Sequence, residues 1–313
     1  MWRLMLGVLL MWVGGVYGQD YPNRPIRIVT SGIGGSNDIP ARLIAQALTV
    51  SMGQPVIVEN RPSGLIPGQI VSQAPPDGYT LLVAGGAFVI GPFLQKTPYD
   101  PVKDFVPVTL VSRQPSVLVV HPSLPVKSIP ELITLAKTRP GELNYGASGI
   151  GSTSHLAAEL FNSMANVKII RINYKGPTPL LIDLIGGQVQ LTFATASSVA
   201  PYLNPGKLKA LAATSAEPSA LALGLTTVAA SGLPGYAIES NQIVLAPAKT
   251  PDAIVKRLHF EIVRYLNLTE TKEKFFNAGT EVVGGSPEQL AAAMKSEIAR
   301  MGKVIKDAGI SAN

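Results

Sequence analysis

The stretch LNYGASGIGSTSHLAAELF, Leu143–Phe161, is the most informative about the fold. A short strand-like segment runs into a loop rich in Gly, Ser and Thr, and a segment with helical periodicity follows. The stretch IVTSGIGGSNDIPARL, Ile28–Leu43, has the same construction. Such a turn leaves unpaired backbone N–H groups at the positive end of a helix, where an anion is favoured. Two such turns, one in each half of the chain, predict two lobes that present N–H groups across a cleft.

Strand-like and helix-like segments alternate along most of the chain, which predicts an α/β fold with mostly parallel sheets flanked by helices. The predicted strands are 26–30, 56–59, 80–84, 117–120, 143–145, 169–172, 191–193, 210–214 and 243–246. The predicted helices are 40–52, 129–137, 153–164, 180–185, 251–266, 271–278 and 287–307. Because Pro40 biases Ile39 away from helical angles, we expect the first helix to start a residue or two late.

The loop of the opening stretch fits no catalytic motif. A nucleophile elbow needs a glycine two places after the serine, but Gly149 follows Ser148 directly. No lysine follows the glycines as in a phosphate loop, and Ser154 stands where a dinucleotide loop has its last glycine. The three histidines have no metal-ligand spacing. We therefore predict no catalytic residue, no metal and no cofactor, and a loop that suits a carboxylate which is bound and not converted.

Composition narrows the class of protein. The 313 residues suffice for two domains with cores of their own, and there is no cysteine for disulfides or metal ligation. The Lys and Arg residues are scattered, so the net charge of +6 does not predict nucleic-acid binding. At the N-terminus Arg3 precedes an apolar run, 4–13, that is too short to span a bilayer. We predict a signal peptide, 1–18, cleaved near Gly18, and a periplasmic protein.

Several segments resemble, in the same order, those of one known family. They are YPNRPIRIV at 21–29, GGSNDIPARL at 34–43, GQPVIVENRP at 53–62, PPDGYTLL at 75–82, PYDPVKDFVPVTLV at 98–111, the stretch at 143–161, NYKGPTPLLIDLIGGQVQLTF at 173–193, SGLPGY at 231–236 and LAPAKTP at 245–251. The chain resembles the extracytoplasmic solute receptors of tripartite tricarboxylate transporters, the Bug (Bordetella uptake gene) group. The resemblance covers essentially all of the mature chain.

The resemblance implies a two-lobe periplasmic binding protein of type II-like architecture, with the ligand in the interlobe cleft. Lobe 1 would comprise 19–114 and 242–313, and lobe 2 would comprise 115–241. Two crossing strands, near Ser116–His121 and Ala237–Val244, would form the hinge. The implied partners are a small organic carboxylate and the membrane subunits of a transporter, and we expect a monomer.

Matching the family's pocket loops to this sequence gives the candidate ligand-binding residues. They are Gly34, Gly35, Ser36, Asn37, Asp38 and Ala87 in lobe 1, and Ser148, Gly149, Gly151, Ser152, Thr153, Tyr174, Lys175, Gly176 and Thr195 in lobe 2. Lys175 is the best candidate for a charged contact, and Asp38 is expected to serve its helix N-terminus. Ser152 or Thr153 is also expected to cap the following helix.

The sequence departs from the family pattern at three loops. The loop after Pro62 lacks the usual run of glycines, and 84–87 offers no hydroxyl. After Phe193 the family usually has an acid, and Ala194 stands here instead. A missing acid removes a partner for an amino or hydroxyl group, which led us to hypothesise a ligand less polar than an amino acid. Two alternatives stay open at this point: a receptor that feeds a sensor kinase, and an exported hydrolase that uses Ser148.

Overall fold

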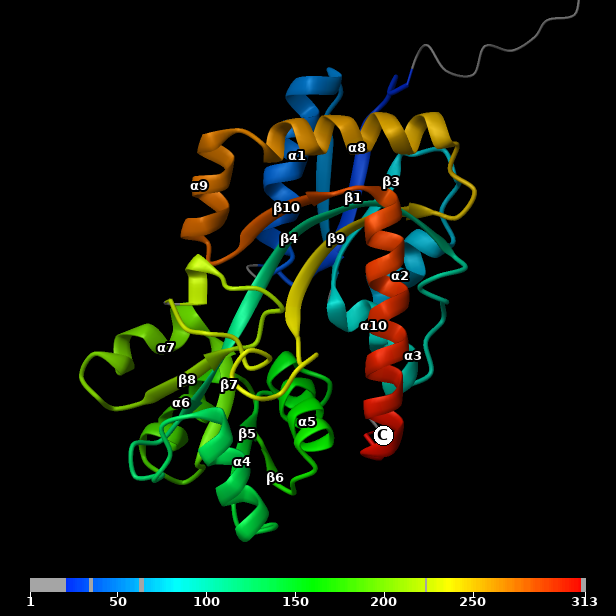
Figure 1. Cartoon of the computed structure of the whole chain (residues 1–313). Helices are drawn as coiled ribbons and strands as arrows, with labels where there is room; N and C mark the ends of the chain where they lie inside the picture. The colour runs from blue at the N-terminus through cyan, green and yellow to red at the C-terminus, as the bar shows by residue number, and fades with distance from the viewer. Residues whose placement is uncertain (1–20, 34–35, 62–64, 223, 311–313) are drawn as a thin grey trace, which may run out of the picture.

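The computed structural model describes all residues except 1–20, 34–35, 62–64, 223 and 311–313, so the predicted signal peptide lies outside the described residues. Two groups of strands, each covered by helices, are joined through one long strand, β4 (Phe105–Val120) (Figure 1). Up to Pro115 this strand pairs with β9 (Glu239–Pro247), and from Ser116 it pairs with β7 and β8. The structure therefore has the predicted two-lobe α/β architecture.

The first lobe has the strand order β2-β1-β3-β9-β4, with β10 on the other side of β4. Its further strands are β1 (Ile26–Ser31), β2 (Val56–Arg61), β3 (Thr80–Gly85) and β10 (Glu281–Gly285). Its helices are α1 (Asp38–Met52), α2 (Leu65–Ser72), α3 (Gly86–Leu94), α8 (Asp252–Leu266), α9 (Thr269–Asn277) and α10 (Pro287–Asp307). Its core is built from alternating apolar side chains of β1, β3 and β9 packed against these helices.

The second lobe has the order β4-β7-β5-β6, with β8 also on β4. Its further strands are β5 (Asn144–Ala147), β6 (Ile170–Asn173), β7 (Leu191–Thr195) and β8 (Lys209–Ala213). Its helices are α4 (Ile129–Thr138), α5 (Thr153–Ala165), α6 (Pro177–Ile185) and α7 (Ala196–Leu203), with a short 3-10 turn, η1 (Ala220–Ala222). Both sheets are mixed: β1, β2 and β3 are parallel in the first lobe and β5, β6 and β7 in the second. The antiparallel pairs come from β9, which runs against β3 and β4, and from β4, which runs against β7, β8 and β10.

The chain passes between the lobes at two adjacent places. On β4 the pairing changes between Pro115 and Ser116. On the return, the Ile238 N–H donates to the Thr214 carbonyl in the second lobe, and Glu239 pairs with Pro115 in the first. Side-by-side crossings of this kind suit a hinge.

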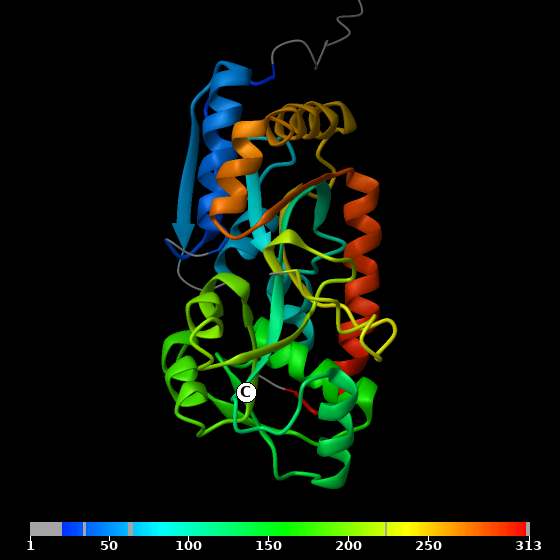
Figure 2. The same cartoon turned by 60° about the vertical axis from the view of Figure 1, so that its left-hand side comes forward.

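The C-terminal helix α10 contacts both lobes (Figures 1 and 2). Met301 and Ile305, four residues apart on one face, are buried with Phe161 of α5 in the second-lobe core. Leu94 of α3 joins the same cluster. The predicted lobe 1 segment 242–313 therefore ends by packing on the second lobe as well.

The start of α1 differs from the prediction. The helix begins at Asp38, so Pro40 is its third residue and does not delay it. The first N–H groups of a helix have no acceptor within the helix, so a proline there removes no hydrogen bond. The first-lobe turn thus keeps its place at the helix end.

Candidate functional site

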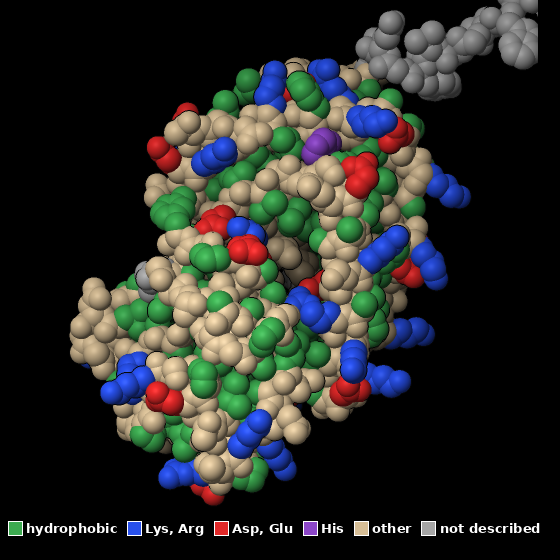
Figure 3. Space-filling model, viewed as in Figure 1, with side chains coloured by type: hydrophobic (Ala, Val, Ile, Leu, Met, Phe, Trp, Pro, Cys, Tyr) green, Lys and Arg blue, Asp and Glu red, His purple; other side chains and the backbone are tan. Residues whose placement is uncertain are grey.

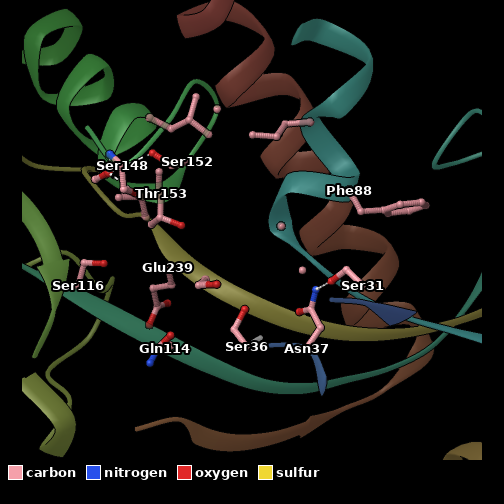
Figure 4. A pocket seen from close by; sticks show the side chains of 18 of the residues that line it. Ser31, Ser36, Asn37, Phe88, Gln114, Ser116, Ser148, Ser152, Thr153 and Glu239 are labelled. Atoms are coloured by element: carbon pink, nitrogen blue, oxygen red, sulfur yellow. Dashed lines mark hydrogen bonds between the residues drawn. The ribbon is translucent and has the colours of Figure 1, made fainter. Parts of the chain in front are cut away.

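A cleft of about 660 Å³ lies between the lobes and is lined by both of them and by the crossing strands. Figure 3 shows a hollow between the lobes, with acidic and basic side chains gathered beside it. Figure 4 shows Ser148, Ser152 and Thr153 on one wall, Ser36 and Asn37 on the other, and Gln114 and Glu239 on the crossing strands. The two turns that the sequence singled out therefore face one cavity.

Five helices whose N-cap residues are described begin at this cleft. Four of their N-cap residues line it, namely Asn37 of α1, Gly85 of α3, Ser152 of α5 and Thr195 of α7, and Pro177 lines it at the start of α6. Only the α5 terminus has a side-chain cap hydrogen bond. At the other four, the N-cap side chain does not accept a hydrogen bond from the first turn. Each helix also places about half a positive charge at its N-terminus.

Among the described residues that line the cleft there is no Lys, Arg or His, and the only charged side chains are Glu239 and Glu297. The dipoles of the helices therefore supply positive potential at the walls of the cleft. Such a site can hold an anion at fixed N–H positions. Within the described part of the chain, no group of three or more His, Cys, Asp or Glu could hold a metal ion.

The second-lobe turn is fixed by its own side chains. The Ser148 N–H donates to Ser154 Oγ at 3.0 Å, and Ser152 Oγ donates to the Gly149 carbonyl at 2.7 Å. Ser152 Oγ also accepts from the His155 N–H as the helix cap. These bonds occupy the Ser148 N–H but leave the N–H of Thr153, in the first turn of α5, without an acceptor inside the helix.

His155 is fully buried and belongs to the support of this turn. Its Nδ1 accepts from the Gly151 N–H at 3.0 Å, and its Nε2 lies 2.7 Å from Nη1 of Arg171. Burial, with Arg171 as the second cause, lowers the pKa of His155 to about 4. The ring is thus neutral and engaged at Nδ1, while Ser148 Oγ lies 3.1 Å from Ser154 Oγ and has no histidine beside it.

The first-lobe turn is held more loosely among its described residues. Asn37 Nδ2 donates to Ser31 Oγ at 3.1 Å, but the Asn37 side chain does not cap α1 and its Oδ1 is buried without a hydrogen bond. Asp38 is buried beside the cleft, where its carboxylate accepts from Asn60 and pairs with Arg42. These contacts connect the first turn of α1 to Asn60 of β2, and the role of Asp38 at the helix N-terminus stays a prediction.

One side of the cleft, within the first lobe, is apolar. Leu65, Phe88, Leu94 and Tyr99 line it from the first lobe, and the rings of Phe88 and Tyr99 stack with centroids 4.7 Å apart. Leu94 also reaches the second lobe, since a Cβ on Gly151 would lie 2.5 Å from its Cδ1. A ligand in this cleft therefore meets polar helix ends and an apolar side.

The candidate residues divide into three groups. Those that line the cleft are Ser36, Asn37, Ser148, Gly151, Ser152, Thr153 and Thr195. Those not among its lining residues are Asp38, Gly149, Tyr174, Lys175 and Gly176. Gly34 and Gly35 lie outside the described residues, as does the side chain of Ala87. Ligand contact stays a prediction for all of them.

Two of the candidates that do not line the cleft, Tyr174 and Lys175, lie just before helix α6. Lys175 is exposed, and Tyr174 donates from its hydroxyl to Asp183 at 2.9 Å. Burial first, then Asp183, raises the pKa of Tyr174 to about 12. Both residues precede α6, whose first residue, Pro177, does line the cleft.

Sequence reasoning placed the hinge at the crossing strands but named none of their residues as lining the cleft. Gln114, Ser116, Glu239 and Ser240 line the cleft where β4 and β9 pair. They follow no glycine turn and no helix start, so the pattern that revealed the two walls gave no signal for them. Glu239 matters most, because the hypothesis of a weakly polar ligand rested on a missing acid.

Two mixed sheets, two adjacent crossings and a cleft ringed by helix N-termini define a two-lobe solute-binding protein. Residues 40–310 match the family "Tripartite tricarboxylate transporter family receptor". The chain belongs to this family, and the resemblance seen in its sequence is confirmed. No helix in the described part of the chain combines the length and hydropathy needed to cross a membrane.

Relatives and solved structures agree with this assignment. BugT of Bordetella pertussis (strain Tohama I) is 34% identical over 314 residues, 97% of this chain and 96% of the relative. The structure described as "R. palustris Rpa4515 with adipate" has 38% identity, covers 93% of this chain and 99% of its own, and has a TM-score of 0.75. MatC of Rhodopseudomonas palustris with bound malate has 29% identity, covers 91% and 100%, and has a TM-score of 0.72.

Proposed function

We propose that this chain captures a small organic carboxylate in the interlobe cleft and delivers it to the membrane subunits of a tripartite tricarboxylate-type transporter. The convergence of these five helix N-termini on a cleft whose described lining residues include no cation carries the proposal. Neutral N–H and hydroxyl donors hold a carboxylate without a full counter-charge, which permits release. The adipate and malate of the two solved relatives support this ligand class.

The proposed contacts are the candidate residues that line the cleft. The N–H and hydroxyl groups of Thr153 would donate from the second lobe, next to Ser152, and Ser36 and Asn37 would act from the first. Closure of the lobes at the crossing strands would then be the event that the membrane subunits detect. We propose export by the signal peptide 1–18, a monomer and a periplasmic location, as the receptor family implies.

Binding without turnover is part of the proposal. The hydroxyl of Ser148 faces Ser154, and His155, the nearest histidine in sequence, accepts from the Gly151 N–H instead. A serine hydrolase needs a base within hydrogen-bond reach of its nucleophile. This arrangement supports a receptor over the hydrolase alternative, and we propose no catalytic residue, metal or cofactor.

A thermal-shift screen of the chain against mono-, di- and tricarboxylates tests the function. A ligand present at about one hundred times its Kd stabilises the folded state by about 2.7 kcal/mol, which is a readable shift. We expect at least one carboxylate to raise the midpoint and the matching amide to have no effect. A screen in which no carboxylate raises the midpoint would overturn the proposal.

A further inference from the structure

Glu239 occupies a distinctive place in the cleft. It is the first residue of β9 and pairs with Pro115 of β4, at the point where the chain passes between the lobes. It lines the cleft, and its side chain is only 14% exposed. Figure 4 shows it with Gln114 on the crossing strands, apart from the helix starts of the two walls. A carboxylate so enclosed would ordinarily have hydrogen-bond donors around it.

The donors nearest to Glu239 are used by another acid. Its Oε1 is buried without a hydrogen-bond partner, and Arg113 Nε is 3.9 Å away, beyond hydrogen-bond distance. The same Nε donates to Glu281 at 3.3 Å, and the hydroxyl of Ser219 donates to Glu281 at 2.5 Å. Glu281 therefore takes the hydrogen bond of Arg113, and Glu239, a residue that lines the cleft, keeps one carboxylate oxygen without a hydrogen bond.

The charges around Glu239 do not balance. The groups that act on it are Arg113 and Glu281 on one side, and Glu297 and Arg300 of α10 on the other. With Glu239 these make three carboxylates and two guanidinium groups. Arg300 is already paired with Glu297 at 2.5 Å. Burial raises the pKa of Glu239, and a further cation at this place would offset that cost.

The cleft is therefore dipolar, with helix N-termini on its walls and an under-satisfied acid on its crossing strands. We propose that Glu239 is the second recognition point of the cleft and selects carboxylates that also carry a protonated amino group. The inference rests on the proposed function, in which the helix termini hold the carboxylate. Glu239 would supply, from a different strand, the acid that Ala194 withholds after Phe193. The hypothesis of a weakly polar ligand would then apply only to the apolar side of the cleft.

Isothermal titration calorimetry with length-matched probes tests this. The probes are hexanoate, its ω-amino derivative and adipate, and their shorter counterparts butanoate, its ω-amino derivative and succinate. The variants are Glu239→Gln, which keeps shape and an acceptor but removes the charge, and Glu297→Gln, which changes a cleft acid that already has Arg300. The thermal unfolding midpoint of each variant shows whether it is folded. If Glu239→Gln does not fold, Glu239→Asp, which keeps the charge on a shorter side chain, replaces it in the test.

In the wild type we expect one of the amino derivatives to bind about tenfold or more tightly than its plain counterpart, the factor expected for one charge-assisted hydrogen bond. Glu239→Gln should remove that preference while plain carboxylates bind at least as tightly as before, because a negative charge is removed from the cleft. Glu239→Asp should reduce the preference, and Glu297→Gln should keep it. Plain or dicarboxylate probes that bind at least as tightly as the amino derivatives, or a preference that survives in Glu239→Gln, would overturn the inference and leave the function standing. Absence of binding by every carboxylate would overturn both.

Discussion

The two walls of the cleft have the same strand–turn–helix construction but are held differently. In the second lobe, Ser152, Ser154 and His155 bind the turn's own N–H and carbonyl groups. In the first lobe, Asn37 gives α1 no cap and keeps a buried oxygen unpaired. The second wall is thus a preorganised donor surface, whereas the first retains polar groups that a ligand can satisfy. Preorganised groups lose little conformational entropy when a ligand binds, and a polar group without a partner gains a hydrogen bond on binding.

The largest effect should come from adding a methyl group to the second wall. Gly151 has φ +74, and a Cβ there would lie 2.5 Å from Leu94 Cδ1. The left-handed backbone costs an L-residue about 1–2 kcal/mol, and the forced repacking adds about 1–3 kcal/mol. Gly151→Ala should therefore lower the free energy of unfolding by about 2–5 kcal/mol, measured by denaturant titration.

The matched control for this change lies on the first wall. Gly86 also lines the cleft, but a Cβ there meets no atom within 4 Å. Gly86→Ala should change the free energy of unfolding by less than about 1 kcal/mol, and in helix α3 the sign can favour alanine. Equal losses in the two variants would show that the second wall is no more tightly fitted than the first.

The next effect concerns pH. A histidine whose pKa is lowered to about 4 in the folded state cannot take the proton that the unfolded chain accepts below about 6.5. Stability is therefore lost as the pH falls through this window, by about 3 kcal/mol when the loss is complete. The free energy of unfolding should therefore decrease more between pH 7 and pH 4 in the wild type than in the variant His155→Asn.

The asparagine oxygen of this variant can still accept from the Gly151 N–H, so it isolates titration from the loss of the hydrogen bond. Its own stability at neutral pH serves as the control for the substitution itself. Parallel pH profiles in the two proteins would mean that His155 does not carry the pH dependence of the second wall.

A smaller effect separates the two N-caps. Ser152→Ala removes a cap bond and should cost about 1 kcal/mol of stability, whereas Asn37→Ala removes none and should cost less than about 0.5 kcal/mol. Carboxylate affinity should also fall in Asn37→Ala, because this amide lines the cleft and its Nδ2 carries a second N–H beyond the one donated to Ser31. Chemical denaturation and calorimetry with one carboxylate from the screen check both. A stability loss at Asn37 as large as that at Ser152 contradicts the difference between the walls.

Periodicity and turn chemistry predicted most of the elements, and the two glycine turns predicted the cleft. The predictions failed where contacts between distant segments, and not the local sequence, determine the secondary structure. The strand β4 has 16 residues, but Pro107 and Pro115 interrupt its pattern, and only 117–120 was predicted. Helix α3 contains Gly91 and Pro92 and is stabilised by its packing on α10. Glu239 could not be found because its place in the cleft depends on pairing with a residue more than one hundred positions away.

The smallest effect should come from Lys175, the residue that sequence reasoning favoured for a charged contact. It is exposed and is not among the residues that line the cleft, so its attraction for a bound carboxylate is screened by water and salt. Lys175→Ala should change carboxylate affinity by less than about twofold, with Thr153→Ala, a lining residue, as the comparison. A tenfold loss that weakens with added salt would mean that lobe closure brings the start of α6 onto the ligand. In that case the ligand-binding surface of the second lobe would include Lys175 as well as the turn before α5. Its positive charge would reach the ligand only in the closed, ligand-bound state.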